Sequence, residues 1–351
     1  FQAAALVLPN DPAVLRSPSN SATLLIISHK NFMAEAQAWA NYRIGQGISV
    51  KLIDVSEIYD EFNYGDTSAQ SIKTFLLYAK NSWQNAPSYV LLIGDASYDA
   101  RNYEGLGYNN FVPTRIVTTV FGEAGSDDSL TDFNGDGLAE MAIGRITART
   151  SQTVTNAMAK VTAWEAATPT PQARGALFAY DWYDASNNYD FEAISTRLKN
   201  QLPGTITSSM VGRGDTPPPP GTPQSVLISS INTGKYVVNY AGHGTTGAWA
   251  STDFFSNNNV PALTNASNQS IFTMLTCFNG YFLHVQNKSL GETLLEATNG
   301  GAVAAWASTG ETTPDVQEAM ATRFFLKLGQ GQIERLGDHV NDAKTVIPGG
   351  T

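Results

Sequence analysis

The sequence predicts an α/β protein made of two halves, each built on a mostly parallel sheet covered by helices. Short apolar runs of strand length alternate with amphipathic helical patterns along the whole chain, which is typical of such sheets. The alternation is interrupted at residues 167–171, where Ala-Thr-Pro-Thr-Pro ends a helical pattern before the next strand begins. We therefore expect an N-terminal α/β subdomain over residues 1–170 and a C-terminal subdomain over residues 171–351.

The first half begins with the order βαβαβ, the pattern of a parallel sheet with helices on both faces. Ser68 has the residue type and place of a helix N-cap. Residues 100–136 are rich in Gly, Asn and Asp and are expected to be mostly loop. The expected strands are 23–28, 48–55, 89–93 and 141–143, and the expected helices are 31–44, 68–79 and 151–166.

The second half repeats this alternation without repeating the sequence. Two of its apolar runs lead directly into chemically active residues, His243 and Cys277. The expected strands are 176–180, 206–210, 236–239, 271–274 and 302–307, and the expected helices are 191–202, 224–232, 289–298 and 314–328.

The composition excludes several classes of protein. Of 351 residues, 42% are apolar and 15% charged, so the chain has ample material for a core and is not expected to be disordered. The net charge is −10 and no basic cluster is present, which argues against a nucleic-acid partner. No apolar stretch reaches the roughly 18 residues that span a bilayer, so no membrane span is expected.

The residue usage is typical of an exported protein. Asn, Ser and Thr are plentiful and Lys is scarce, while one cysteine excludes an internal disulfide. We expect a secreted or bacterial cell-surface location. Because the sequence starts without Met or a signal peptide and stops in a loop, we expect a processed or trimmed piece of a longer precursor.

His243 and Cys277 are the strongest functional signal. The carboxyl ends of parallel strands line the crevice where α/β proteins bind ligands, and both residues follow such strands. A thiol is mostly protonated at neutral pH, so attack on a carbonyl needs a base such as His243, which later protonates the leaving amine. The amides of Gly244 and Cys277 are candidate donors to the oxyanion. Taken singly, a lone Cys is usually packing and a lone His is usually a surface residue; their pairing on two strand exits favours catalysis.

The segments 239–244 (Asn-Tyr-Ala-Gly-His-Gly) and 276–280 (Thr-Cys-Phe-Asn-Gly) resemble the gingipain family of cysteine peptidases, peptidase family C25. Residues 91–95, 132–145 and 300–309 also fit, and the resemblance extends from about residue 23 to 328. The resemblance implies a caspase-like, three-layer αβα sandwich with two subdomains side by side. It places the catalytic site in the C-terminal one.

The resemblance also implies hydrolysis of peptide bonds through a Cys277 thioester, with His243 as general acid and base. An acidic third member is implied at the end of the first strand of the second half, where Asp181 and Asp184 both qualify. We favour Asp181 because it lies at the strand exit. The alternative is that both are solvated loop carboxylates.

In this family, members that cut after Arg or Lys place a carboxylate in the pocket for the residue before the scissile bond. Asp190 lies in the matching neighbourhood but is also a natural N-cap for the helix that follows. Ala241, Leu275 and Trp306 are expected to line the pocket. The preferred side chain at the cut is therefore left open.

Residues 127–140 suggest a calcium loop. Oxygen ligands alternate in Asp-Phe-Asn-Gly-Asp-Gly at 132–137, as at the start of an EF-hand. A complete EF-hand is excluded because its twelfth position is Ile143 rather than Glu. A partial structural calcium site and a turn without an ion are both open; no organic cofactor is expected. The candidate ligands are Asp127, Asp128, Asp132, Asn134, Asp136 and Glu140.

Two other functions compete with a peptidase. A cell-surface sortase or transpeptidase of the same fold would pass the acyl group to an amine instead of water. A catalytically inactive, calcium-stabilised surface binding module would retain the fold alone, which the intact His243 and Cys277 pair argues against. The expected partners are polypeptide substrates and the protein's own pro-segment or C-terminal domains.

Overall fold

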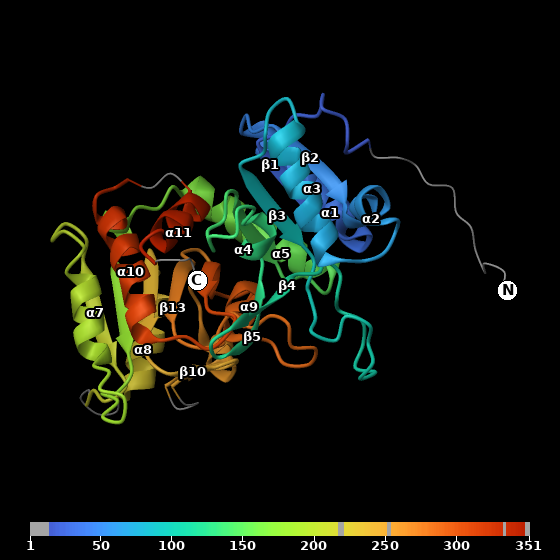
Figure 1. Cartoon of the computed structure of the whole chain (residues 1–351). Coiled ribbons are helices and arrows are strands. Elements are labelled where there is room, and N and C mark those ends of the chain that lie inside the picture. The colour runs from blue at the N-terminus through green and yellow to red at the C-terminus, as the bar shows by residue number, and fades with distance from the viewer. Residues whose placement is uncertain (1–13, 217–220, 251–253, 333–334, 348–351) are drawn as a thin grey trace.

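The structure is a computed structural model that describes residues 14–216, 221–250, 254–332 and 335–347. Two parallel sheets lie in the two halves of the chain, each between layers of helices (Figure 1). The predicted fold class, an αβα sandwich with two mostly parallel sheets, is confirmed.

The first sheet has the order β2-β1-β3-β6, and all its pairings are parallel. One face packs on α1 and α5 through a cluster that includes Ile26, Trp39 and Val154. The other face packs on α2, α3 and α4 through Leu25, Phe75 and their neighbours. The elements are β1 (Leu24–Ser28), η1 (Lys30–Phe32), α1 (Met33–Gly45), β2 (Val50–Asp54), α2 (Val55–Asn63), α3 (Ala69–Ser82), β3 (Tyr89–Ile93), α4 (Asp128–Thr131), β6 (Ala142–Ile146) and α5 (Ser151–Ala167).

The second sheet has the order β14-β13-β9-β7-β8 and is also parallel. Phe178, Phe191 and Phe325 belong to the core between this sheet and α7, α10 and α11. Leu227, Phe272 and Leu290 belong to the core on the opposite face, beneath α8 and α9. The elements are α6 (Pro171–Arg174), β7 (Ala176–Tyr180), α7 (Phe191–Lys199), β8 (Ser208–Gly212), α8 (Pro223–Asn232), β9 (Val237–Ala241), β13 (Ser270–Leu275), α9 (Leu290–Glu296), β14 (Ala302–Ala307), α10 (Pro314–Gly329) and α11 (Leu336–Lys344).

Local sequence signals explain where the main helices start. The Ser68 side chain accepts a hydrogen bond from the Gln70 amide, so the predicted N-cap of α3 is confirmed. Ser289 and Glu292 form a reciprocal capping box at the start of α9. Asp190 caps α7 by accepting from the Ala193 amide at 2.9 Å.

The structure also contains elements that the apolar pattern does not indicate. Within the segment expected to be loop, β4 (Arg115–Thr119) and β5 (Gly122–Ser126) form an antiparallel hairpin. Its strands are largely exposed and rich in Gly and Thr, so they lack the alternation that marks a strand. A second, three-stranded set comprises β10 (Gly244–Thr245), β11 (Ala248–Trp249) and β12 (Phe255–Ser256), followed by η2 (Asn257–Ala262).

Segments of each half reach into the other half. The β4–β5 hairpin extends from the first half toward the second (Figure 1), where the Thr309 hydroxyl donates to the Gly125 carbonyl at 2.6 Å. In return, α11 contacts β6 of the first sheet, and Lys344 pairs with Asp128. The two sheets are therefore tied together by segments distant in sequence.

Buried polar groups connect the halves as well. Arg149, beyond β6, pairs with Asp95 at 2.6 Å and donates to the Val285 and His284 carbonyls at 2.7 and 2.8 Å. Lys160 on α5 donates to the carbonyls of Leu294, Leu295 and Ala302 at 3.1, 2.8 and 3.2 Å. These contacts fix α9 and the chain after Cys277 against the first half.

Among the described residues, no helix combines the length and apolar character that crossing a membrane requires.

Glu292 at the start of α9 is a buried carboxyl whose titration can be tested. It is 3% exposed, and burial, together with the nearby Asp95 carboxylate, raises its pKa to about 8. Because the folded state holds this proton more tightly than the unfolded state, the stabilising contribution of Glu292 falls as pH rises from about 4.5 to about 8.

We predict that Glu292→Gln, which removes this titration, gains stability relative to the wild type as pH rises through that window. The gain is at most about 1.4 kcal/mol per pH unit. Urea denaturation of both proteins between pH 5 and 8 measures it, with Glu123→Gln on exposed β5 as the control. A stability difference that does not vary with pH would contradict the prediction.

Candidate active site

The pairing of β9 with β13 brings His243 and Cys277 to the same level of the second sheet. The last pair in the register is Ala241 with Leu275. Each candidate residue lies two positions beyond its member of that pair, and the Gly242 amide donates to the Leu275 carbonyl at 3.3 Å. The two strand exits are thus in direct backbone contact.

Both candidate residues lie on the side of the sheet that faces α7 and α10. The His243 ring is 5.4 Å, centroid to centroid, from the ring of Phe191 on α7. The Cys277 sulfur is 3.6 Å from the carbonyl oxygen of Thr312, just before α10. The imidazole is 54% exposed and the cysteine is half-buried, so both are accessible from solvent.

Asp184 contacts the imidazole. Its Oδ2 lies 3.0 Å from His243 Nε2. The Asn187 side chain and the Ser186 amide donate to the same carboxylate at 2.8 and 2.9 Å. The Asn187 hydrogen bond is the main cause that lowers the pKa of Asp184 to about 2, with a further contribution from His243. An ionised carboxylate can only accept, so Nε2 carries the proton and Nδ1 is left as the basic nitrogen.

Asp181, which sequence analysis favoured as the partner of the imidazole, instead holds the backbone beneath it. The carboxylate is 5% exposed and its Oδ2 accepts from the His243 amide at 3.4 Å. Its Oδ1 accepts from the Trp182 amide at 2.8 Å and from Arg213 at 3.3 Å. The geometry therefore favours Asp184 as the residue that orients the ring.

Arg213 was not singled out from the sequence. Its guanidinium stacks over the Trp182 ring at 4.0 Å while pairing with Asp181. Only the parallel pairing of β7 and β8 brings Arg213, one residue past β8, to Asp181, one residue past β7. No local motif could have indicated this.

The surroundings of the Cys277 sulfur favour the protonated thiol over the thiolate. Burial raises the pKa of Cys277, partly opposed by a backbone hydrogen bond from Thr312 and reinforced by the carboxylate of Glu311. Among the contacts of the described residues, none joins the sulfur directly to the imidazole. The arrangement fits a neutral thiol beside a neutral imidazole better than a preformed pair of thiolate and imidazolium.

The chain segments that follow His243 and precede Cys277 lie close together. The Ala250 amide donates to the His243 carbonyl at 2.6 Å, so the next pair, Gly244 with Trp249, is a non-hydrogen-bonded one. The Gly244 N–H therefore points away from β11. A Cβ at Gly244 would lie 2.3 Å from the Thr276 hydroxyl, which explains why glycine is needed there.

Phe278, directly after Cys277, has a φ of +59°. A left-handed conformation is uncommon for an aromatic residue and marks strain of the kind found at functional sites. The Phe278 amide donates to the Gly310 carbonyl at 3.1 Å, which fixes the turn.

The residues expected to line a substrate pocket have different environments. Ala241 and Leu275 are 1% and 6% exposed and form the buried floor next to the site. Trp306 is half-buried, and its ring centre is 5.5 Å from that of Phe324. The Asp190 carboxylate caps α7, the alternative role that sequence analysis gave it.

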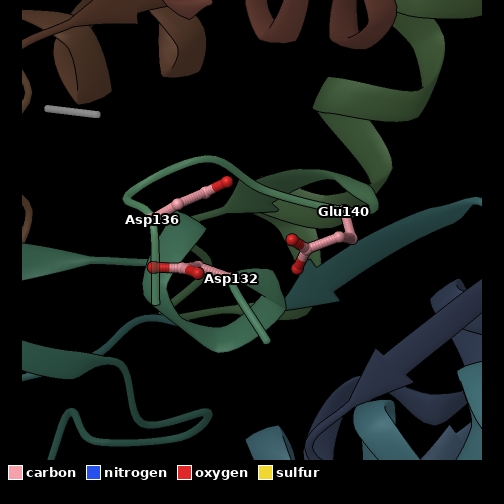
Figure 2. Close-up of side chains that lie close together, drawn as sticks. All are labelled: Asp132, Asp136 and Glu140. Atoms are coloured by element: carbon pink, nitrogen blue, oxygen red, sulfur yellow. The ribbon is translucent and has the colours of Figure 1, made fainter. Parts of the chain in front are cut away.

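Part of the candidate calcium set lies together. Asp132, Asp136 and Glu140 each offer an oxygen within 4.8 Å of the others (Figure 2). Asn134 contacts Asp136 at 3.0 Å. The other two candidates are paired elsewhere: Asp127 with Arg145 at 2.7 Å, and Asp128 with Lys344.

Comparison with protein-family models matches residues 17–348 to Peptidase family C25. Lys-gingipain W83 of Porphyromonas gingivalis is 24% identical over 300 residues, covering 80% of this chain and 15% of the relative. The chain therefore spans a small part of that protein.

Two solved structures share the fold. The Arg-specific cysteine proteinase gingipain R has a TM-score of 0.75 at 19% identity, covering 94% of this chain and 74% of the other. The complex of Porphyromonas gingivalis RgpB pro- and mature domains has a TM-score of 0.72 at 19% identity, covering 92% and 73%. A caspase-like fold is consistent with both likenesses.

The thiol environment predicts how Cys277 reacts with iodoacetamide. Because its pKa is raised, the native thiol should alkylate more slowly near pH 8 than the urea-unfolded chain, and its rate should still increase above pH 9. Glu311→Gln should increase the native rate at pH 8 by about two-fold, an effect that salt reduces. Mass spectrometry follows the reaction directly, because the chain has one cysteine. A native rate that levels off below pH 7 would instead indicate a preformed thiolate.

Proposed function

Because the chain belongs to peptidase family C25, a family of cysteine peptidases, we propose that it hydrolyses peptide bonds in polypeptides through a thioester on Cys277. The observation that carries the proposal is the β9–β13 register, which sets His243 and Cys277 two residues beyond one strand pair. The Asp184 contact to the imidazole supports it.

The first stage forms the acyl-enzyme. The sulfur attacks the scissile carbonyl as its proton passes to Nδ1 of His243, and the negative oxygen is stabilised by the Gly244 and Cys277 amides. The imidazolium then gives that proton to the leaving amine as the C–N bond breaks. A thioester and a free amino terminus result.

The second stage regenerates the thiol. Nδ1 takes a proton from water, the hydroxide oxygen bonds to the thioester carbon, and the C–S bond breaks as the sulfur regains the proton. Asp184 keeps the Nε2–H in place and stabilises the imidazolium in both stages. Asp181 and Arg213 keep the backbone of His243 in position.

Four substitutions test this assignment. Cys277→Ala and His243→Ala should abolish cleavage of a diverse peptide pool. Asp184→Asn should lower kcat at least about 100-fold with little change in KM, because a neutral amide does not stabilise the imidazolium and its NH2 group can select the wrong imidazole tautomer. Asp181→Asn should mainly lower stability, and Asp66→Asn, on an exposed loop, serves as control. Strong loss of kcat in Asp181→Asn, with Asp184→Asn unaffected, would reverse the two roles.

The same assay decides the acceptor of the acyl group. With glycine amide added, a hydrolase yields mainly free carboxylates, whereas a transpeptidase yields the amide adduct. The position of the cuts reports the side-chain preference. Asp190 is committed to capping α7, so we propose that it does not supply a basic-residue pocket.

We also propose that Asp132, Asp136 and Glu140 bind a structural calcium ion, with Asn134 as a further oxygen donor. The donor set fits, since calcium prefers carboxylate and amide oxygens. The local backbone already curls around these groups: Asp132 accepts from the Gly135 and Gly137 amides at 2.7 and 3.1 Å. Each carboxylate retains lone pairs for an ion. The ion would neutralise the clustered charge.

Calcium should raise the melting temperature of the wild type, and excess EGTA should lower it. At a concentration 100 times the dissociation constant, the stabilisation is about 2.7 kcal/mol. Asp136→Asn should weaken the response, whereas Asp127→Asn should leave it in place while lowering stability through the loss of the Arg145 pair. Equal melting in calcium and EGTA would rule out the site.

We further propose a secreted or cell-surface location and contact with a pro-segment or C-terminal domains of the same polypeptide. The chain covers 15% of Lys-gingipain W83, and a solved complex of a similar fold contains RgpB pro- and mature domains. Both features support a catalytic piece of a longer protein.

A further inference from the structure

Asn279 connects the turn that carries Cys277 to the hairpin that follows His243. Its side chain is 0% exposed, and its Nδ2 donates to the Thr245 carbonyl at 2.7 Å and to the Ala248 carbonyl at 3.2 Å. Thr245 and Ala248 face each other across β10 and β11. One amide group therefore holds both strands of the hairpin.

We propose that Asn279 is a positioning residue that holds the His243 hairpin in register with the Cys277 turn; this rests on the proposed function. The contact adds to a short pairing, because β10 and β11 have two residues each. So short a ladder fixes little by itself. The strand pairing of β9 with β13 ends at Ala241 and Leu275, before either catalytic residue.

The turn at Asn279 is itself well anchored. The Gly291 amide donates to the Asn279 carbonyl at 2.9 Å, and the Gly280 amide donates to the Ser308 carbonyl at 2.8 Å. The strained Phe278 lies between Cys277 and Asn279. The side chain of Asn279 thus ties the hairpin to a fixed turn. Because only Gly244 separates Thr245 from His243, the same contact restrains His243.

Asn265 offers a matched control at the other end of the sheet. It is 2% exposed, and its Nδ2 donates to the Gly301 and Asn268 carbonyls at 3.1 and 3.4 Å. Gly301 precedes β14, so this asparagine braces the amino ends of the strands, away from His243 and Cys277. Both residues are buried amides whose Nδ2 groups donate to two carbonyls, and Asn265 also accepts from the Gly301 amide at 2.8 Å, so its loss should cost at least as much stability.

The first test uses the full chain and a peptide that the wild type cleaves. Asn279→Ala should lower kcat about 100-fold with a small change in KM, since a displacement of about 1 Å at a catalytic group has that effect. Asn265→Ala should lose comparable stability but keep kcat within about three-fold when measured well below its melting temperature. Equal kcat values for the two variants would overturn the proposal.

Asn279→Asp adds a readout that a purely structural role does not predict. An ionised carboxylate cannot donate to Thr245 and Ala248, whereas the protonated form can donate one hydrogen bond. The variant's kcat, relative to the wild type at the same pH, should therefore rise as the pH falls. A constant ratio across pH would count against the role of the amide hydrogens.

A double-mutant cycle keeps this inference separate from the peptidase proposal. Iodoacetamide alkylation of Cys277 is measured in the wild type, Asn279→Ala, His243→Ala and the double variant. If Asn279 positions the imidazole, removing His243 changes the rate in the wild type and has little effect in Asn279→Ala. If the wild type cleaves no peptide, but the effect of removing His243 on alkylation still depends on Asn279, the peptidase proposal is refuted and the positioning role is retained. The positioning role would be refuted if removing His243 left the alkylation rate of the wild type unchanged. It would also be refuted if removing His243 changed the rate as much in Asn279→Ala as in the wild type.

Discussion

The parallel pairing of β9 with β13 is the constraint on which the rest of the site depends. It aligns Ala241 with Leu275, so that His243 and Cys277, each two residues further on, lie at one level and on one face of the sheet. Side chains alternate between the faces of a sheet, and a shift of one residue in this register would send one of the pair to the opposite side. Buried apolar residues on both strands fix the register, since Phe272 and Val238 pack on one face and Leu275 and Ala241 on the other.

Beyond the ends of β9 and β13, polar contacts instead of strand pairing hold His243 and Cys277. Asp181 holds the His243 backbone, Asp184 holds its ring, and the Thr312 carbonyl contacts the sulfur. These partners come from the ends of β7, the loop after it, and the approach to α10. The site is thus assembled from loops that each leave a rigid strand or lead to a rigid helix, which allows precise placement with little regular structure.

The connection between the two halves serves the same end. Arg149 and Lys160 reach from the first half to carbonyls of the second, next to α9 and the chain after Cys277. Their partners are carbonyls rather than carboxylates in five of the six contacts, so the two cations act mainly as donors to backbone groups. The first half therefore supports the sheet edge that carries His243 and Cys277, in addition to forming a sheet of its own.

The sequence by itself determined the fold class, the main helices and strands, and the two strand exits that carry His243 and Cys277, because apolar periodicity and cap residues are local signals. Asp184, rather than Asp181, reaches the imidazole because of a loop conformation built by Asn187 and Ser186. The β4–β5 hairpin is local, but its strands carry no apolar alternation that would indicate them. The contacts of Arg213 with Asp181 and of Asn279 with Thr245 and Ala248 join residues far apart in the chain. Only the tertiary structure decided those contacts, since the energies that select them arise between segments that no local pattern connects.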